Sequence, residues 1–150
     1  KMSLERILSG MQISASGLAG ERLRMEVVAH NIANAHSTST PGGGPYRRQR
    51  VSFQAAMDQF SLGAGHLERP ELGGVQIVGI TTDDSPLPQI YDPGHPDAQA
   101  DGYVVMPNVT LPHEMVDLVT ATRAYEANLK SMESFRQMAE QALSLLRGLG

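Results

Sequence analysis

The chain of 150 residues has no cysteine, which excludes disulfide bonds and thiolate metal sites. It also lacks any apolar run near the ~20 residues that a membrane-spanning helix needs, so we expect no membrane insertion. We expect no cleaved signal peptide in the first residues, because Glu5, Arg6, Ser9 and Gly10 interrupt each apolar run. If the protein works outside the cytoplasm, we expect export by a route that reads no cleaved leader.

Aromatic residues and net charge are both low. Five of the seven aromatic residues lie in the middle of the chain, at Tyr46, Phe53, Phe60, Tyr91 and Tyr103. The middle can therefore form a small core of its own at best. The formal net charge of −4 lacks the basic footprint that nucleic acid requires, so we expect no nucleic-acid partner. Arg47, Arg48 and Arg50 form a basic cluster, which we interpret as a solvated strand face or as partners for acidic neighbours.

Proline is missing from both ends, because all nine prolines fall between Pro41 and Pro112. Both flanking arms are therefore free of helix breakers. In the first arm apolar residues recur every seventh position, at Leu4, Met11, Leu18, Met25 and Ile32. In the last arm a mainly apolar stripe steps by three and four through Met115, Leu118, Thr122, Tyr125, Leu129 and Met132, then Ala139, Leu143 and Leu146. Stripes spaced in this way let helices bury a long seam against one another.

These patterns predict one helix from Ser3 to about Asn34 and a second from about Thr110 to Arg147. Thr110 is a suitable N-cap, and Pro112 lies in the first turn, where its missing N–H is harmless. Glu114 and Asp117 suit the positive end of the helix dipole. A second stripe beside the first, at Phe135, Met138, Ala142 and Leu145, favours contacts with more than one neighbour.

The first predicted helix contains three glycines, at Gly10, Gly17 and Gly20, each costing about 1 kcal/mol relative to alanine. Gly10, Ser14 and Gly17 lie on one face and predict a small-residue groove that another backbone can approach closely. The alternative is that the glycines merely weaken a surface helix. In either case the helix is marginal alone and needs a packing partner.

Between the arms, residues 37–45 form a hinge or loop, since they contain two prolines and three consecutive glycines. Four short strands are predicted further on, at 48–53, 75–80, 87–91 and 103–106. We therefore assign a mainly α fold with a small antiparallel β insert. The terminal helices (1–36 plus 110–150) are expected to form a coiled-coil domain, and residues 37–109 a β-rich and loop insert.

Signatures of catalysis and of cofactor binding are weak. The glycines at 42–44 lack the Lys-Ser/Thr pair that follows in a phosphate-binding loop. His113 and Glu114 lack the second histidine of a zinc-protease helix. We therefore predict no catalytic residue, no cofactor and no enzymatic activity, although a triad assembled in space stays open.

Candidate metal ligands occur in two groups. Asp92, His95, Asp97 and Asp101 could gather around a cation, but prolines and a glycine between them favour a rigid turn with solvated carboxylates. His30 and His36 are six residues apart and so do not share a helical face. We predict a helix-end or surface role for these histidines, and no metal site.

Six segments together resemble the family of flagellar rod and hook proteins. Residues 29–35 (Ala-His-Asn-Ile-Ala-Asn-Ala) are similar to the N-terminal family signature, which usually has asparagine where this chain has His30. Residues 106–109, 114–118 and 123–128 resemble its C-terminal signature. Residues 44–51 and 91–98 are similar to a component of the proximal rod within that family. The resemblance spans nearly the whole chain in order and in length.

The resemblance implies a structural subunit of the bacterial flagellar basal body, without enzymatic activity, in the hollow periplasmic rod that carries torque. It implies passage through the flagellar export apparatus and self-association in the rod. The implied partners are other proximal rod proteins, the adaptor linking the rod to the membrane ring, and the distal rod protein. We predict an assembly interface made of the two heptad seams listed above together with Asn31, Asn34 and Asn128.

Two other functions stay open from sequence. One is a helical interaction module, such as an export adaptor or chaperone, whose amphipathic ends clasp a partner. It would form a defined small oligomer in solution, whereas a rod subunit should stay monomeric until the adjacent rod layer nucleates it. The other is a peptidoglycan-cleaving enzyme, which turnover on purified cell wall would reveal.

Overall fold

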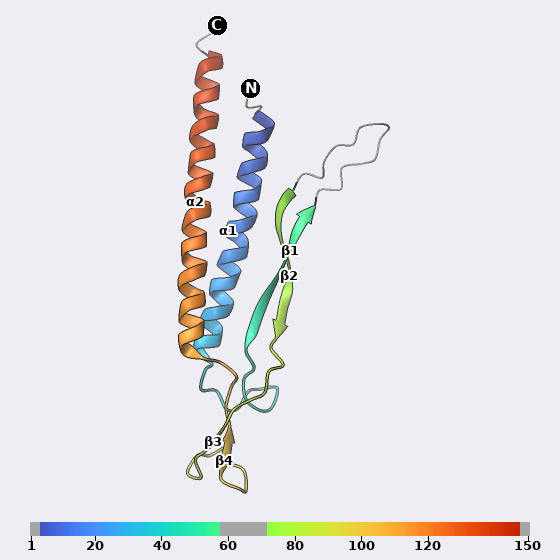
Figure 1. Ribbon diagram of the computed structural model, residues 1–150, viewed down its shortest axis with the longest axis vertical. Coiled ribbons are helices and arrows are strands. Elements are labelled where there is room, and N and C mark those ends of the chain that lie inside the picture. The colour runs from blue at the N-terminus through green and yellow to red at the C-terminus, as the bar shows by residue number, and fades with distance from the viewer. Residues whose placement is uncertain (1–3, 58–71, 148–150) are drawn as a thin grey trace, which may run out of the picture. The chain divides into compact units, whose positions relative to one another are not determined.

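The computed structural model describes residues 4–57 and 72–147 of the chain (Figure 1). Helices occupy its two ends, and four strands lie between them. In chain order the elements are α1 (Leu4–Ala33), β1 (Gln49–Met57), β2 (Leu72–Thr82), β3 (Gln89–Tyr91), β4 (Tyr103–Val105) and α2 (Leu111–Arg147). The predicted class, terminal helices around a small antiparallel β insert, is confirmed.

The helix bounds follow from local sequence. α1 has 30 residues and is therefore about 45 Å long. α2 begins directly after Thr110, the predicted N-cap, whose carbonyl accepts the N–H of Glu114 at 3.1 Å. The predicted capping residues Ser3 and Gly148 lie outside the described residues.

The four strands form two separate two-stranded ribbons, one of β1 with β2 and one of β3 with β4. In the second ribbon Ile90 lies opposite Val104 in antiparallel register, and the rings of Tyr91 and Tyr103 meet edge to face at 5.3 Å. The β1 and β2 arrows run in opposite directions in Figure 1. β1 extends to Met57, beyond the predicted end at Phe53, because cross-strand pairing outweighs the weak β propensity of the intervening Gln and Ala residues.

Contacts within the chain define two compact units, and each unit combines helix with insert. Of the described residues, the first unit contains 4–22, 53–57, 72–78 and 122–147, and the second contains 23–52 and 79–121. The predicted division into a terminal-helix domain (1–36 plus 110–150) and an insert (37–109) stays a prediction.

In the first unit, side chains of α2 lie against the glycines of α1. A Cβ atom placed on Gly10 would lie 2.5 Å from Cζ of Phe135, and one placed on Gly17 would lie 2.8 Å from Nδ2 of Asn128. Contacts this short mean that a larger residue at either glycine would displace the facing side chain of Phe135 or Asn128. The predicted packing groove is therefore confirmed, with the difference that an aromatic ring and an amide enter it, not a backbone.

The β1–β2 ribbon also contacts α1 within the first unit. A Cβ atom on Gly20 would lie 3.1 Å from the Phe53 ring, and the Oγ of Ser16 accepts the N–H of Val75 at 3.0 Å. Gly74 has a φ of 104°, a backbone conformation that residues with a side chain rarely adopt. At this glycine the strand lies directly against Ser16. Small residues on α1 thus allow both α2 and the β1–β2 ribbon to pack closely against it.

The predicted α2 stripe divides into two lines. Leu118, Tyr125, Met132 and Ala139 are half-buried within the chain. Met115, Thr122, Leu129 and Leu143 are exposed. On α1 the residues Met11, Leu18, Met25 and Ile32 are half-buried, and the side chains of Leu4 and Leu146 lie outside the described residues. Part of the apolar surface of α2 is therefore exposed in the single chain.

Candidate functional site

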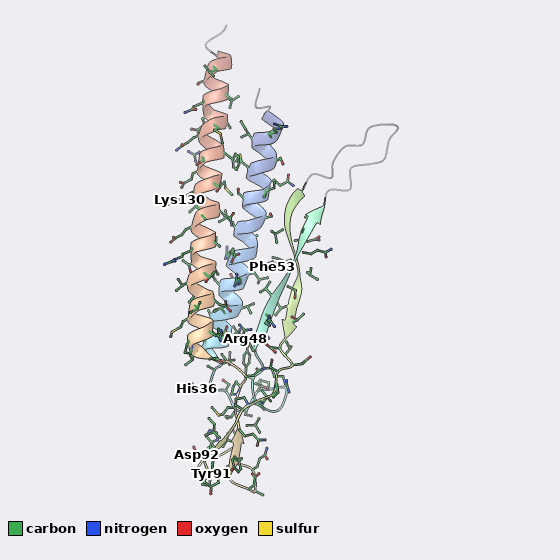
Figure 2. The ribbon with its side chains drawn as sticks, in the orientation of Figure 1. His36, Arg48, Phe53, Tyr91, Asp92 and Lys130 are labelled. Atoms are coloured by element: carbon green, nitrogen blue, oxygen red, sulfur yellow. The ribbon has the colours of Figure 1, made fainter. Side chains whose placement is uncertain are left out.

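A buried polar cluster lies in the second unit, where the end of α1 meets the start of β1 and the start of α2. Its members, here called the Arg48 cluster, are Asn31, Tyr46, Arg48, Asp83, Glu114 and Asp117. Figure 2 labels Arg48 near the start of β1. The cluster joins three elements that are far apart in the sequence.

Asn31 is the link between α1 and the other two elements, and only 1% of its surface is exposed. Its Oδ1 accepts the O–H of Tyr46 at 2.8 Å and the N–H of Gln49 at 2.9 Å. Its Nδ2 donates to the carbonyl of Gln49 and to Oε2 of Glu114, both at 2.9 Å. The amide therefore uses two donors and two acceptor sites, and it pairs with the backbone of Gln49 as a neighbouring strand would.

Glu114 is fully buried and is paired with Arg48. Arg48 Nε donates to Oε1 of Glu114 at 2.6 Å, and Nη2 donates to Oδ2 of Asp117 at 3.1 Å. Burial alone would lower the pKa of Arg48, but the hydrogen bond and charge of Glu114, together with Asp117 and Asp83, raise that pKa above its ordinary value. Arg48 therefore stays charged and compensates a carboxylate removed from water.

Asp83 closes the cluster from the turn after β2. The Ser85 hydroxyl and the Ser85 N–H donate to its carboxylate, and these bonds, with Arg50 and Arg48 nearby, lower the pKa of Asp83. Asn108 connects the same turn to β1, because its Oδ1 accepts the Arg48 N–H at 2.8 Å and its Nδ2 donates to the Asp83 carbonyl at 3.0 Å. The interpretation of the basic cluster as partners for acidic residues is therefore confirmed for Arg48 and Arg50.

We expect the Tyr46 hydroxyl to stabilise the folded chain by about 1 kcal/mol, the typical net value of a hydrogen bond. Burial, and then the charge of Glu114, raise the pKa of Tyr46. The folded state therefore holds this proton more tightly, so the contribution is complete below about pH 10 and is lost as pH rises through the folded pKa. Denaturant unfolding of wild type and Tyr46→Phe, from about pH 8 to about pH 11, measures the difference in their free energies of unfolding. A difference that stays constant across this range would contradict the assignment.

Asn34 holds the last turn of α1 in a different way. Its Nδ2 donates to the carbonyl of His30 at 2.9 Å, and its Oδ1 accepts the Ser37 hydroxyl at 3.1 Å. His30 itself lies against Tyr46, with ring centroids 5.5 Å apart in an edge-to-face arrangement. The predicted helix-end role of His30 is confirmed, and its ring also packs on Tyr46. Asn31 and Asn34 bond within the chain at the same end of α1, and their predicted place in an assembly interface stays a prediction.

Asn34→Ala should destabilise the chain by about 1 kcal/mol, because the carbonyl of His30 and the Ser37 hydroxyl each lose a partner. The expected metal content of the purified protein is unchanged, because both partners of the Asn34 amide are protein groups. Thermal unfolding and elemental analysis of the two proteins check this. Stoichiometric zinc that is lost in the variant would show that Asn34 is a ligand after all.

The acidic segment before β4 forms a turn. The carboxylate of Asp92 accepts the N–H of Gly94 at 3.2 Å, and that of Asp101 accepts the N–H of Tyr103 at 3.2 Å. Nδ1 of His95 accepts the N–H of Asp97 at 3.1 Å. The predicted turn is confirmed. Across residues 4–57 and 72–147, no three His, Asp or Glu side chains are grouped to hold a metal ion.

The geometry of the Arg48 cluster is that of a structural contact, which holds the end of α1, the start of β1 and the start of α2 together. Its central groups, Asn31 and Glu114, are buried, and each is bonded to other parts of the chain. The sequence predicted only that Glu114 suits the positive end of the α2 dipole. Its pairing with Arg48, 66 positions away, was not predicted. A pattern read along one helix gives no signal for such a pair.

Comparison with known proteins agrees with this structural role. Residues 11–41 match the family described as "Flagella basal body rod protein", and residues 100–145 match "Flagellar basal body rod FlgEFG protein C-terminal". The flagellar basal-body rod protein FlgC of Borreliella burgdorferi is 41% identical, over 95% of this chain and 99% of that protein. The chain belongs to the FlgC family of flagellar basal-body rod proteins. Other FlgC relatives occur in Bacillus subtilis (41% identity, 90% of this chain, 95% of the relative) and Salmonella typhimurium (37%, 93% and 97%).

The two matched segments carry three of the six residues of the Arg48 cluster. Residues 11–41 contain Asn31, and residues 100–145 contain Glu114 and Asp117. The same segments also contain Asn34 and Asn108, which bond beside the cluster. The predicted resemblance to the rod and hook family is thereby confirmed, and FlgC relatives span the intervening insert as well. Among the described residues, neither helix has both the length and the apolar character needed to cross a membrane.

Proposed function

We propose that this chain is a structural subunit of the flagellar basal-body rod, which assembles through its terminal helices into the hollow shaft that transmits torque. The observation that carries the proposal is membership in the FlgC family over nearly the full length of both chains. A structure with two long helices and an apolar surface left open on one of them supports the same reading.

The proposed assembly surface includes the exposed line on α2. Met115, Leu129 and Leu143 lie along this line, and Val119 follows Met115 by one helical turn. Each of the four exposes about two fifths or more of its surface in the subunit. Apolar surface gathered in this way favours a protein neighbour over water. We propose that helices of adjacent subunits cover it. Asn31 and Asn34 contribute indirectly, because their amides fix the end of α1 within the subunit.

The proposed partners are the other proximal rod proteins, the adaptor that links the rod to the membrane ring, and the distal rod protein. We place the subunit in the periplasmic rod after passage through the flagellar export apparatus, and we assign it no enzymatic activity. Membership in a rod-protein family favours this structural role over the alternative of an export adaptor or chaperone.

The test is a cryo-EM map of basal bodies isolated from a strain in which this chain replaces the resident FlgC protein. We expect restored motility and density for the subunit in the rod. A soluble oligomer of fixed size that is absent from purified basal bodies would support the adaptor alternative and overturn the proposal. Basal bodies from the strain lacking any FlgC protein provide the matched control.

A further inference from the structure

The contacts between α1 and α2 follow one antiparallel register. Gly10 lies against Phe135, and Gly17, seven residues later, lies against Asn128, seven residues earlier. In the second unit Asn31 bonds Glu114. Asn31 comes 14 residues after Gly17, and Glu114 comes 14 residues before Asn128. All three pairs therefore belong to the same heptad alignment, and Asn31 with Glu114 forms a fully buried polar layer within it.

The rest of this seam does not specify the alignment well. A shift of seven residues would put Phe135 over Gly17, which is another glycine, and Ala142 over Gly10. The half-buried residues also recur every seven positions, at Met11, Leu18, Met25 and Ile32 on α1 and at Leu118, Tyr125, Met132 and Ala139 on α2. The shifted seam would thus bury residues of the same kind at most positions.

The polar layer does not tolerate that shift. Asn31 would face Ala121, and its Nδ2 would lose the Glu114 acceptor. Glu114 would lie beyond the end of α1 at Ala33, and the Arg24–Asp117 ion pair, 3.3 Å long, would also break. Unpaired buried polar groups are unfavourable, and a single buried polar residue is known to fix register in coiled coils.

We propose that the Asn31–Glu114 layer fixes the register of α1 against α2 and excludes the alignment shifted by seven residues. The inference goes beyond rod membership, because it concerns the alignment of helices within one subunit. It gives the family signature around Asn31 an internal role. The competing determinant is the insert, whose contacts at Gln49 and Asn108 also tie the two helix ends together.

Spin-label distances on the full-length chain test the proposal, because the sequence has no cysteine of its own. Labels on Ala15→Cys and Ser144→Cys occupy exposed positions of the first unit and leave the seam intact. A shift of seven residues moves one helix along the other by about 10 Å. Dilution with excess unlabelled protein removes distances between molecules.

We expect a single distance in the labelled chain and a second population, displaced by that axial shift, in Asn31→Leu/Glu114→Leu. The control Asn128→Leu replaces a polar residue in another layer and should keep the single distance. If the double variant does not fold, Asn31→Ala retains the Arg48–Glu114 pair and should give the second population at a smaller fraction. A single unchanged distance in the folded variants would show that the insert or the apolar seam sets the register, and would overturn the proposal.

Discussion

Arg48→Met should destabilise the folded chain by about 3–5 kcal/mol, the usual cost of removing one partner of a buried ion pair. The carboxylate of Glu114 is fully buried, and Arg48 Nε is 2.6 Å from its Oε1. Methionine fills a similar volume but brings no charge, so the carboxylate would keep only the Asn31 amide as a polar partner among the contacts described above. For a chain of this size the melting temperature should fall on the order of 10 °C.

The neighbouring arginine supplies the control for this experiment. Arg50 is 62% exposed and lies 3.8 Å from the Asp83 carboxylate. Surface pairs of this kind contribute roughly 0–1 kcal/mol, so Arg50→Met should change stability little. Denaturant unfolding followed by circular dichroism measures both variants. Equal and small effects would show that the Arg48–Glu114 pair adds no more than a surface contact.

Leu143→Asp should abolish rod assembly and motility while leaving the isolated subunit intact. Leu143 is 51% exposed in the subunit, so aspartate there stays solvated and stability should change by less than about 0.5 kcal/mol. In the proposed rod the same position is covered by a neighbouring helix, and an unpaired carboxylate would be buried there at high cost. The expected result is normal subunit levels without rods, seen by electron microscopy of basal-body preparations.

Ser144→Asp is the matched control, because it adds the same charge one position further along α2 at a site that is exposed and polar. Cells with this variant should keep their rods. Intact rods in Leu143→Asp would remove Leu143 from the assembly surface. A subunit that unfolds in solution would instead show that Leu143 acts within the subunit, a result that separates folding from assembly.

Much of the secondary structure was determined by local sequence alone. Proline is confined to residues 41–112, so long helices form at both ends, and Thr110 and Pro112 place the start of α2 to within one residue. The glycines on α1 correctly predicted a groove, because a residue without a side chain in a helix indicates close packing. The family signature at 29–35 was likewise readable from residue order.

The tertiary structure decided which side of each helix faces its own chain and which polar residues meet. Two neighbouring lines on α2 are similarly apolar, so periodicity gave no reason to bury Leu118 and Tyr125 while leaving Met115 and Leu129 exposed. The Asn31–Glu114 bond joins residues 83 positions apart. Local propensity acts over a few residues, whereas the partner of a buried charge is selected by packing between distant segments. For that reason the Arg48 cluster is seen in the fold and not in the sequence.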